Sequence, residues 1–288
     1  MSNSEPNSYH SGYVALVGRP NAGKSTLLNR LVGQKIAAVS NKPQTTRFKI
    51  QGVITKPAGQ IVLVDTPGVH QPGYELNRRM MATVQDALLG VDLVCLLRDA
   101  SVSTGQGDRF VLDLIKRSEK PALLLLNKID KLEDKAALLP LIDWYSQQYN
   151  WREVVPISAL KDEMTDVLLD GCLRHLPAGD PIFSEDELTD QSLRVLVAEI
   201  VREKLLQRMG DEIPYVTAVL TELFEEVRED TDGQKRAEIN SGFVIAARRN
   251  YVGRIRCSPR IDARSTTDTD LVRSRPETGE AVVALRVA

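Results

Sequence analysis

The sequence predicts an α/β domain with a mostly parallel, doubly wound sheet, followed by a smaller α+β domain. Two observations support this prediction. From Tyr13 to about His175, short apolar runs of strand length alternate with segments of helical spacing, which is typical of a parallel sheet wound by helices. A Pro/Gly-rich break at residues 176–181 then separates this pattern from a shorter one. One or two domains are also what a chain of 288 residues normally forms.

Six runs in the first part are expected to be strands. Most are short and apolar, as buried strands are, and the run at 48–54 alternates like a half-exposed strand. Because ligands of open parallel sheets bind beyond the carboxyl ends of the strands, the polar turns after these runs form the candidate site. The six ranges are 13–17, 48–54, 61–64, 91–97, 122–126 and 154–157.

The second part has a weaker pattern. A helix is expected at 192–209, where apolar residues fall on one face, and strands are expected at 213–220 and 239–246. No sustained helical or strand period runs from 247 to 279, and only 281–285 could form a strand there. We therefore predict a disordered start at 1–11, a nucleotide-binding domain at 12–176, a linker at 177–187, a partial second domain at 188–246 and a divergent, poorly ordered tail at 247–288.

The composition argues against several classes of protein. The net charge of −2 gives no general attraction to nucleic acid, so such binding must use a local patch. No apolar run approaches membrane-span length, and the first residues lack a signal-peptide pattern. Cys95, Cys172 and Cys257 have neither metal-site nor disulfide spacing, which favours a reduced, cytoplasmic setting.

The most informative segment follows the first expected strand. It fits G-x-x-x-x-G-K-[ST], the phosphate-binding loop, and it lies between a strand and a helix as that loop requires. Backbone N–H groups of the loop and the dipole of the following helix would point at phosphate. The lysine would reach the β- and γ-phosphates, and the serine hydroxyl would hold Mg²⁺. The residues are Gly18, Arg19, Pro20, Asn21, Ala22, Gly23, Lys24 and Ser25.

A second segment would complete the phosphate site. Asp65-Thr66-Pro67-Gly68 reads as D-x-x-G at the end of the run 61–64 and is followed by Val69. Asp65 is expected to hold Mg²⁺ through water, and the Gly68 N–H is expected to meet the γ-phosphate.

A polar stretch before the half-exposed strand contains two adjacent threonines, Thr45 and Thr46. One of them should reach Mg²⁺ when the γ-phosphate is present, and we favour Thr46. Lys24, Thr46 and Gly68 are accordingly the candidate catalytic residues.

The base would be read by a third segment, Asn127-Lys128-Ile129-Asp130, which fits N-K-x-D after the run 122–126. The Asp130 carboxylate can accept two hydrogen bonds from guanine N1–H and its exocyclic amine, whereas adenine would leave the carboxylate unpaired. A site built in this way discriminates by roughly 10⁴–10⁵. The stem of Lys128 could cover the base, and Ser158-Ala159-Leu160 could add a backbone N–H to the guanine oxygen.

The usual water-orienting glutamine after D-x-x-G is replaced by Val69, which cannot orient water. Three explanations stay open: a switch with very slow turnover, a residue supplied from elsewhere in the structure, or a monovalent cation. Asn21 is a candidate K⁺ ligand beside backbone carbonyls of residues 40–43. His70 is the alternative base, although a loop histidine more often faces solvent.

These motifs together resemble the Era family of bacterial GTPases. The resemblance rests on the phosphate loop and on Pro43-Gln44-Thr45-Thr46-Arg47, Asp65-Thr66-Pro67-Gly68-Val69-His70 and Asn127-Lys128-Ile129-Asp130, and it continues through 188–190, 198–204 and 212–215. It implies GTP hydrolysis with GTP or GDP and Mg²⁺, in a GTPase domain joined to a KH domain. It also implies binding to the 3′ region of 16S ribosomal RNA during small-subunit assembly, with peripheral contact to the inner membrane. A monomer is expected.

The second domain departs from the family pattern. A KH domain clamps RNA with a G-x-x-G loop, and no G-x-x-G occurs from residue 188 onward. After Lys235 every basic residue is an arginine, a change that a frameshift or a divergent terminus would produce. We therefore predict weaker RNA affinity than in a complete family member. Two alternative readings are a nucleotide-dependent binding module without a competent RNA site and a truncated product with an unstable end.

Overall fold

In the computed structural model, the described residues are 9–42, 45–46, 48–69, 75–208, 219, 241–247 and 251–257. The chain divides into two compact units, residues 1–191 and 192–288. Several expectations lie outside the described residues: order at 1–8, the strand at 213–220 apart from Val219, and the strand at 281–285. The predicted domain boundaries stay predictions.

The first unit is built on a six-stranded sheet of order β2-β3-β1-β4-β5-β6. All neighbouring strands are parallel except β2, which runs antiparallel to β3. The predicted mostly parallel α/β architecture is therefore confirmed. The strands are β1 (His10–Gly18), β2 (Ile50–Lys56), β3 (Gly59–Asp65), β4 (Leu93–Asp99), β5 (Ala122–Asn127) and β6 (Glu153–Ile157).

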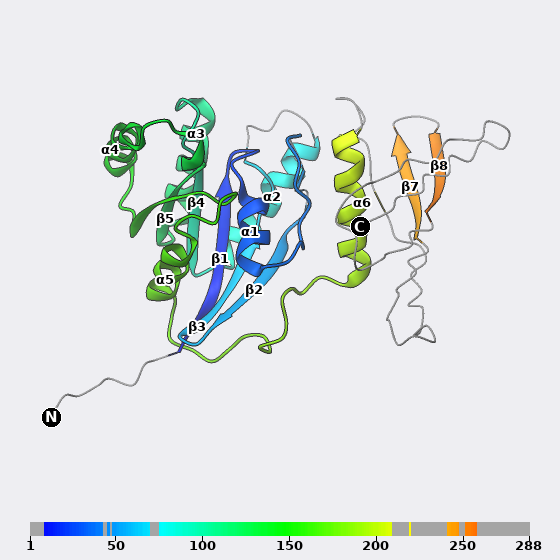
Figure 1. The fold of residues 1–288 in the computed structure, drawn as a ribbon, viewed down its shortest axis with the longest axis horizontal. Helices are drawn as coiled ribbons and strands as arrows, with labels where there is room; N and C mark the ends of the chain where they lie inside the picture. The colour runs from blue at the N-terminus through cyan, green and yellow to red at the C-terminus, as the bar shows by residue number, and fades with distance from the viewer. Residues whose placement is uncertain are drawn as a thin grey trace. The chain divides into compact units, whose positions relative to one another are not determined.

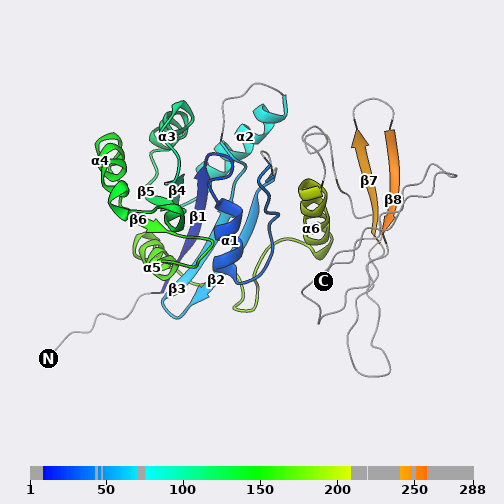
Figure 2. The ribbon, with the colours of Figure 1, turned by 45° about the horizontal axis from the view of Figure 1, so that its top comes forward.

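Helices cover both faces of this sheet. α1 and α5 lie on one face, and α2, α3 and α4 lie on the other (Figure 1). The same two helical layers flank the sheet in the turned view (Figure 2). The helices are α1 (Lys24–Val32), α2 (Glu75–Leu89), α3 (Gln106–Ser118), α4 (Leu138–Gln148) and α5 (Thr165–His175), with single turns η1 (Ile129–Lys131) and η2 (Lys135–Ala137).

The core explains why the central strands read as continuous apolar runs. β5 is buried along its whole length, because helices cover both of its faces. Ala15 and Val17 of β1 belong to the core cluster under α2, α3 and α4. Since side chains alternate along a strand, Val14 and Leu16, which are also fully buried, face the opposite layer.

Strand ends differ slightly from the sequence prediction. β1 begins at His10 rather than at Tyr13, because His10 pairs with Gly59 and its ring Nδ1 lies 2.8 Å from the Leu176 carbonyl oxygen. β4 begins after Asp92, whose carboxylate accepts a hydrogen bond from the Tyr13 N–H at 2.8 Å. Hydrophobicity alone does not reveal these polar contacts.

The predicted linker follows the edge of the first unit and is hydrogen-bonded to it. Gln60 of β3 is fully buried and its amide oxygen accepts hydrogen bonds from the N–H groups of Ile182 and Phe183, at 2.7 and 2.8 Å. Its amide nitrogen donates to the Phe183 carbonyl at 2.9 Å and to the Thr55 hydroxyl at 3.0 Å. All four hydrogen-bonding positions of this side chain are therefore used.

The second unit contains α6 (Leu193–Arg208), as the helical spacing predicts, and a hairpin of β7 (Ser241–Ala247) and β8 (Tyr251–Cys257). The expectation of no strand between 247 and 279 is wrong for β8. The sequence from Tyr251 to Cys257 alternates only weakly, because the arginines at 254 and 256 interrupt its apolar character.

Two further observations concern the described residues as a group. Among them, no helix combines the length and the apolar character needed to cross a lipid bilayer. Cys95 and Cys172 are free and buried, with their sulfur atoms 3.9 Å apart.

Candidate functional site

The predicted site residues converge on one cavity at the carboxyl end of the parallel strands. Its volume is about 280 Å³. The cavity is thus where the topology of an open α/β sheet places a ligand. Among the predicted residues that line it are Pro20, Asn21, Gly23, Lys24, Ser25, Thr45, Thr46, Gly68, Asn127, Lys128, Asp130, Ala159 and Leu160.

The phosphate loop connects β1 to α1. Gly23 has φ +101°, which a residue with a side chain rarely adopts, and a Cβ there would lie 2.3 Å from the Asn127 amide nitrogen. Lys24 is buried, and its ammonium donates to the carbonyls of Gly18 and Arg19, both at 3.2 Å. Burial lowers the pKa of Lys24, and the nearby Asp65 carboxylate partly opposes this shift.

Three oxygen-bearing side chains meet beside the loop. The Ser25 hydroxyl lies 2.8 Å from the Thr46 hydroxyl and donates to the Asp65 carboxylate at 2.6 Å. Thr46 also contacts the same carboxylate oxygen, at 3.3 Å. Oxygen ligands of this kind suit Mg²⁺, which is usually held by one or two protein groups together with phosphates and water. These residues therefore fit the predicted cation.

Not every predicted residue turns its side chain toward the cavity. The Thr45 hydroxyl donates to the Lys42 carbonyl at 2.6 Å and lies 2.7 Å from the Ser40 hydroxyl, within its own loop. The Thr66 hydroxyl is buried and donates to the Leu16 carbonyl at 2.8 Å. Of the two adjacent threonines, Thr46 is thus the one that the fold brings to Ser25.

Gly68 and Val69 pass directly against the phosphate loop. A Cβ on Gly68 would lie 2.8 Å from the Pro20 Cα, so only glycine allows this approach. The Val69 N–H donates to the Gly18 carbonyl at 2.9 Å, and its side chain is buried. Val69 therefore fixes the D-x-x-G segment to the loop and brings no group that could orient water. His70 lies outside the described residues.

Asn127 joins the segments predicted to bind phosphate and base. Its amide nitrogen donates to the Ala22 carbonyl at 2.8 Å, and its amide oxygen accepts from the Ala159 N–H at 3.0 Å. The side chain is buried at the end of β5. One amide thus holds the phosphate loop and the residue 158–160 turn at fixed positions on either side of it.

Asp130 is exposed in the first turn after β5, at the mouth of the cavity. One oxygen of its carboxylate accepts from the buried Ser158 hydroxyl at 2.6 Å. Ser158 also accepts from the Lys161 N–H at 3.1 Å. The hydrogen bond from Ser158 fixes the orientation of the Asp130 carboxylate. Ser158 is thus a positioning group as well as part of the base-side turn.

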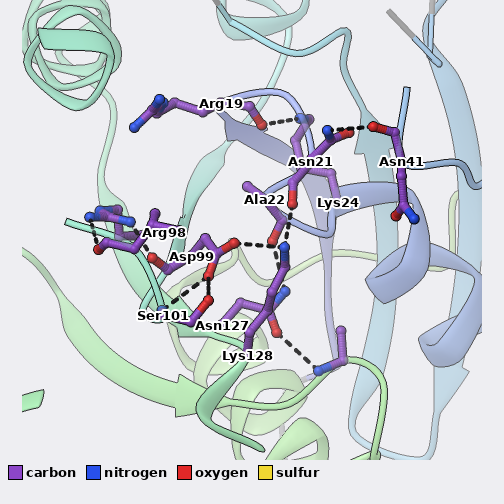
Figure 3. A network of polar contacts seen from close by, with 12 residues as sticks. Arg19, Asn21, Ala22, Lys24, Asn41, Arg98, Asp99, Ser101, Asn127 and Lys128 are labelled. Carbon is purple, nitrogen blue, oxygen red and sulfur yellow. Dashed lines mark hydrogen bonds and ion pairs between the residues drawn. The ribbon is translucent and has the colours of Figure 1, made fainter. Parts of the chain in front are cut away.

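Lys128 has a different neighbourhood from the one expected. Its ammonium donates to the Asn21 carbonyl at 2.7 Å and to the Asp99 carboxylate at 2.6 Å (Figure 3). Asn21 has φ 61°, in the left-handed region, and its side-chain amide donates to the Asn41 carbonyl at 2.9 Å. Asp99 was missed by sequence reasoning, although it too is a polar residue at the carboxyl end of an apolar strand.

This geometry defines the class of protein. A phosphate loop, a serine–threonine–aspartate oxygen cluster and an N-K-x-D segment around one cavity of a parallel sheet are the parts of a P-loop GTPase domain. In agreement, a family model described as 50S ribosome-binding GTPase matches residues 13–128.

Whole-chain comparisons narrow the class. GTPase Era of Ruminiclostridium cellulolyticum is 41% identical over 270 residues, which cover 92% of this chain and 90% of that protein. GTPase Era of Clostridioides difficile is 44% identical over 211 residues, covering 73% and 71%. The chain belongs to the Era family of GTPases.

Solved structures agree with this assignment. An Era variant from Aquifex aeolicus bound to GDP and AlF₄⁻ has a TM-score of 0.72 and 38% identity, covering 76% of this chain and 74% of that one. Era in complex with MgGDPNP and nucleotides 1506–1542 of 16S ribosomal RNA also has a TM-score of 0.72, with 35% identity and coverage of 88% and 80%.

Proposed function

We propose that this protein binds guanine nucleotide in the cavity, hydrolyses GTP to GDP and phosphate, and acts as a switch in assembly of the small ribosomal subunit. The observation that carries the proposal is the Asn127 side chain, which joins the phosphate loop at Ala22 to the base-side turn at Ala159. The two halves of a nucleotide site are thereby held as one. Membership of the Era family supports the same activity.

In this proposal the phosphate chain lies over the loop from Gly18 to Ser25. The backbone N–H groups of this loop and the start of α1 would face the negative charge of the phosphates. Lys24 would turn from the loop carbonyls to the β- and γ-phosphates, and the Gly68 N–H would face the γ-phosphate. Ser25, Thr46 and Asp65 would hold Mg²⁺, which supplies neutralisation of phosphate charge when it is bound.

The base would lie beside Asp130. Its carboxylate, oriented by Ser158, would accept from guanine N1–H and the exocyclic amine, while Asn127 and the turn at Ala159-Leu160 border the other edge. Ile129 is buried, and the stem of Lys128 would flank the base.

Hydrolysis without a glutamine requires another group to act on the developing charge. We include K⁺ in the proposal, held by the Asn21 side chain and backbone carbonyls of residues 40–43. Support comes from the Asn21–Asn41 hydrogen bond, which already brings these two segments together. K⁺ would then lie where it can offset negative charge that builds up between the phosphates.

The partner in this proposal is the 3′ region of 16S ribosomal RNA on the small subunit. An Era relative with 35% identity has been solved with nucleotides 1506–1542 of that RNA. We further propose a monomeric, cytoplasmic protein with peripheral contact to the inner membrane. Sedimentation and vesicle flotation test these last points, and a stable dimer or no flotation would contradict them.

Calorimetry with GDP, GTP and ATP in the presence of Mg²⁺ tests the central proposal. We expect binding of both guanine nucleotides and a preference over ATP of roughly 10⁴-fold. Asp130→Asn should abolish binding of GDP and GTP and create affinity for xanthosine diphosphate, because the amide can donate to the C2 carbonyl of xanthine. Asp143→Asn, on the exposed face of α4, is the matched control. Equal binding of GTP and ATP by the unaltered protein would refute the proposal.

A further inference from the structure

The segment between β4 and α3 carries two carboxylates, Asp99 and Asp108, that belong to none of the nucleotide motifs. Neither lines the cavity. Asp108 nevertheless contacts the side chain of Arg19, which is part of the phosphate loop. Asp99 contacts the side chain of Lys128, which is bonded to the loop (Figure 3). Two carboxylates outside the cavity lining therefore support the loop.

Asp108 holds the side chain of Arg19, the second residue of the phosphate loop. One Asp108 oxygen lies 3.0 Å from the Arg19 guanidinium and also accepts from the Gly105 N–H at 2.9 Å. The other lies 3.1 Å from the Nε of Arg98. Both Asp108 and Arg98 are 2% exposed, so this carboxylate is buried with both oxygens in use. The guanidinium of Arg19 also lies against Gly107 in the first turn of α3.

Asp99 acts on the fourth residue of the loop through Lys128. One of its oxygens lies 2.6 Å from the Lys128 ammonium, which in turn donates to the Asn21 carbonyl at 2.7 Å. The other oxygen accepts from the N–H and the hydroxyl of Ser101, at 3.0 and 2.6 Å. Burial raises the pKa of Asp99, but the bonds from Lys128 and Ser101 outweigh it and the pKa is lowered. The carboxylate is thus charged at neutral pH.

These contacts bear on a loop that is conformationally demanding. Asn21 has a left-handed backbone conformation, and such a residue keeps it only where its surroundings impose it. Charge-assisted hydrogen bonds from rigid elements are suited to that task. A loop already fixed in its binding geometry loses less conformational freedom when phosphate binds.

We propose that Asp99 and Asp108 are positioning residues of the nucleotide site, which hold the phosphate loop in its binding conformation through Lys128 and Arg19. The proposal deepens the function proposed above and rests on it. It extends the nucleotide machinery to the β4–α3 segment.

The test compares dissociation of a fluorescent GDP analogue from the full chain and from Asp99→Asn, Asp108→Asn and Arg19→Met. Each substitution removes one charged partner, and we expect dissociation to be faster by about tenfold. Arg19→Lys should recover part of the loss. Asp113→Asn, on the exposed face of α3, is the matched control and should leave the rate unchanged.

A double-mutant cycle separates positioning from general stability. In the Arg19→Met background, Asp108→Asn should cause little further acceleration of GDP dissociation, because Asp108 contacts the loop through Arg19, which this background lacks. If Asp108→Asn does not fold because it leaves the buried Arg98 without its charged partner, Asp99→Asn and Arg19→Met still decide the question. GDP dissociation within twofold of the unaltered protein in both folded variants would overturn the proposal. Failure of the unaltered protein to bind GDP would instead refute the proposed function.

Discussion

At the residue scale, the two adjacent threonines show what the structure adds to the motif. The sequence places Thr45 and Thr46 in one loop, and spacing cannot separate them. In the structure, Thr46 is buried beside Ser25 and Asp65, whereas Thr45 bonds to Lys42 and Ser40. Only Thr46 can therefore join the oxygen cluster without rearranging its loop.

Thr46→Val tests this difference. The substitution keeps the shape and removes the hydroxyl, so we expect Mg²⁺-dependent GTP hydrolysis to fall by roughly 10²-fold, with a smaller change in GDP affinity. Thr45→Val should cost much less, and Thr83→Val on α2, outside the cavity lining, should leave the rate unchanged. Phosphate release under single-turnover conditions gives the rates. A greater loss of hydrolysis for Thr45→Val than for Thr46→Val would contradict the assignment of Thr46 to the Mg²⁺ site.

The second residue-scale prediction concerns Asn21. GTP hydrolysis should be faster in K⁺ than in Na⁺ at equal ionic strength, because the larger ion suits a site of carbonyl and amide oxygens. Asn21→Ala should remove this stimulation while GDP still binds. Calorimetry with GDP provides the control for an intact nucleotide site. Equal rates of the unaltered protein in the two salts would rule K⁺ out.

The motif residues could be predicted from the sequence because each set is contiguous and its spacing is set by one strand and one turn. Arg98 and Asp108 could not, and Asp99 was missed although it ends an apolar strand as the motif residues do. The ion pair between Arg19 and Asp108 joins residues 89 positions apart, and only the packing of α3 beside β1 brings them together. A charge pair between such distant segments leaves no periodicity in the sequence.

At the scale of elements, the fold was predictable where strands are buried on both faces. β1, β3, β4 and β5 read as apolar runs for that reason. The order of the linker was not predictable, because it depends on polar contacts with Gln60, which lies at the start of β3 just before the apolar run 61–64. Proline and glycine in the segment 177–181 indicate a break in regular structure, but they do not indicate which residues hydrogen-bond to the linker.

Gln60→Leu tests whether that contact orders the linker. The substitution leaves the backbone groups of Ile182 and Phe183 without their partner, and we expect a loss of about 2–4 kcal/mol in the free energy of unfolding. Faster proteolytic cleavage within 177–187 should accompany it. Denaturant unfolding and limited proteolysis measure the two effects. Gln147→Leu, on the exposed face of α4, should stay within about 0.5 kcal/mol. Unchanged proteolysis of Gln60→Leu would contradict the assignment.

At the scale of the whole molecule, the two units differ in how far their sequences follow the family. The first carries each nucleotide motif in order. The second has a helix at α6 and a β7–β8 hairpin but no G-x-x-G from residue 188 onward. Nucleotide binding and RNA binding are therefore expected to depart from the family norm by different amounts.

We expect the protein to bind an oligonucleotide of the 16S 3′ region at least about tenfold more weakly than GTPase Era of Clostridioides difficile measured alongside it. The sequence from residue 188 onward has no G-x-x-G with which to clamp the RNA backbone, and arginines supply salt-dependent attraction that does not select sequence. Affinity for a scrambled oligonucleotide should accordingly be similar and should fall steeply with salt. Tight binding that is selective for the 3′ sequence would contradict this prediction.

The contact of residues 188 and 189 with β2 has a consequence for behaviour at high concentration. β2 is the outermost strand on its side of the sheet, and such a strand offers unpaired backbone groups to neighbouring molecules. Here the Leu188 carbonyl accepts from the Val53 N–H at 2.9 Å and the Thr189 hydroxyl donates to the Gln51 carbonyl at 2.6 Å. At the opposite border, Pro156 of β6 has no N–H to offer. Both borders of the sheet are thus guarded against edge-to-edge aggregation, one of them by the chain on its way to the second unit.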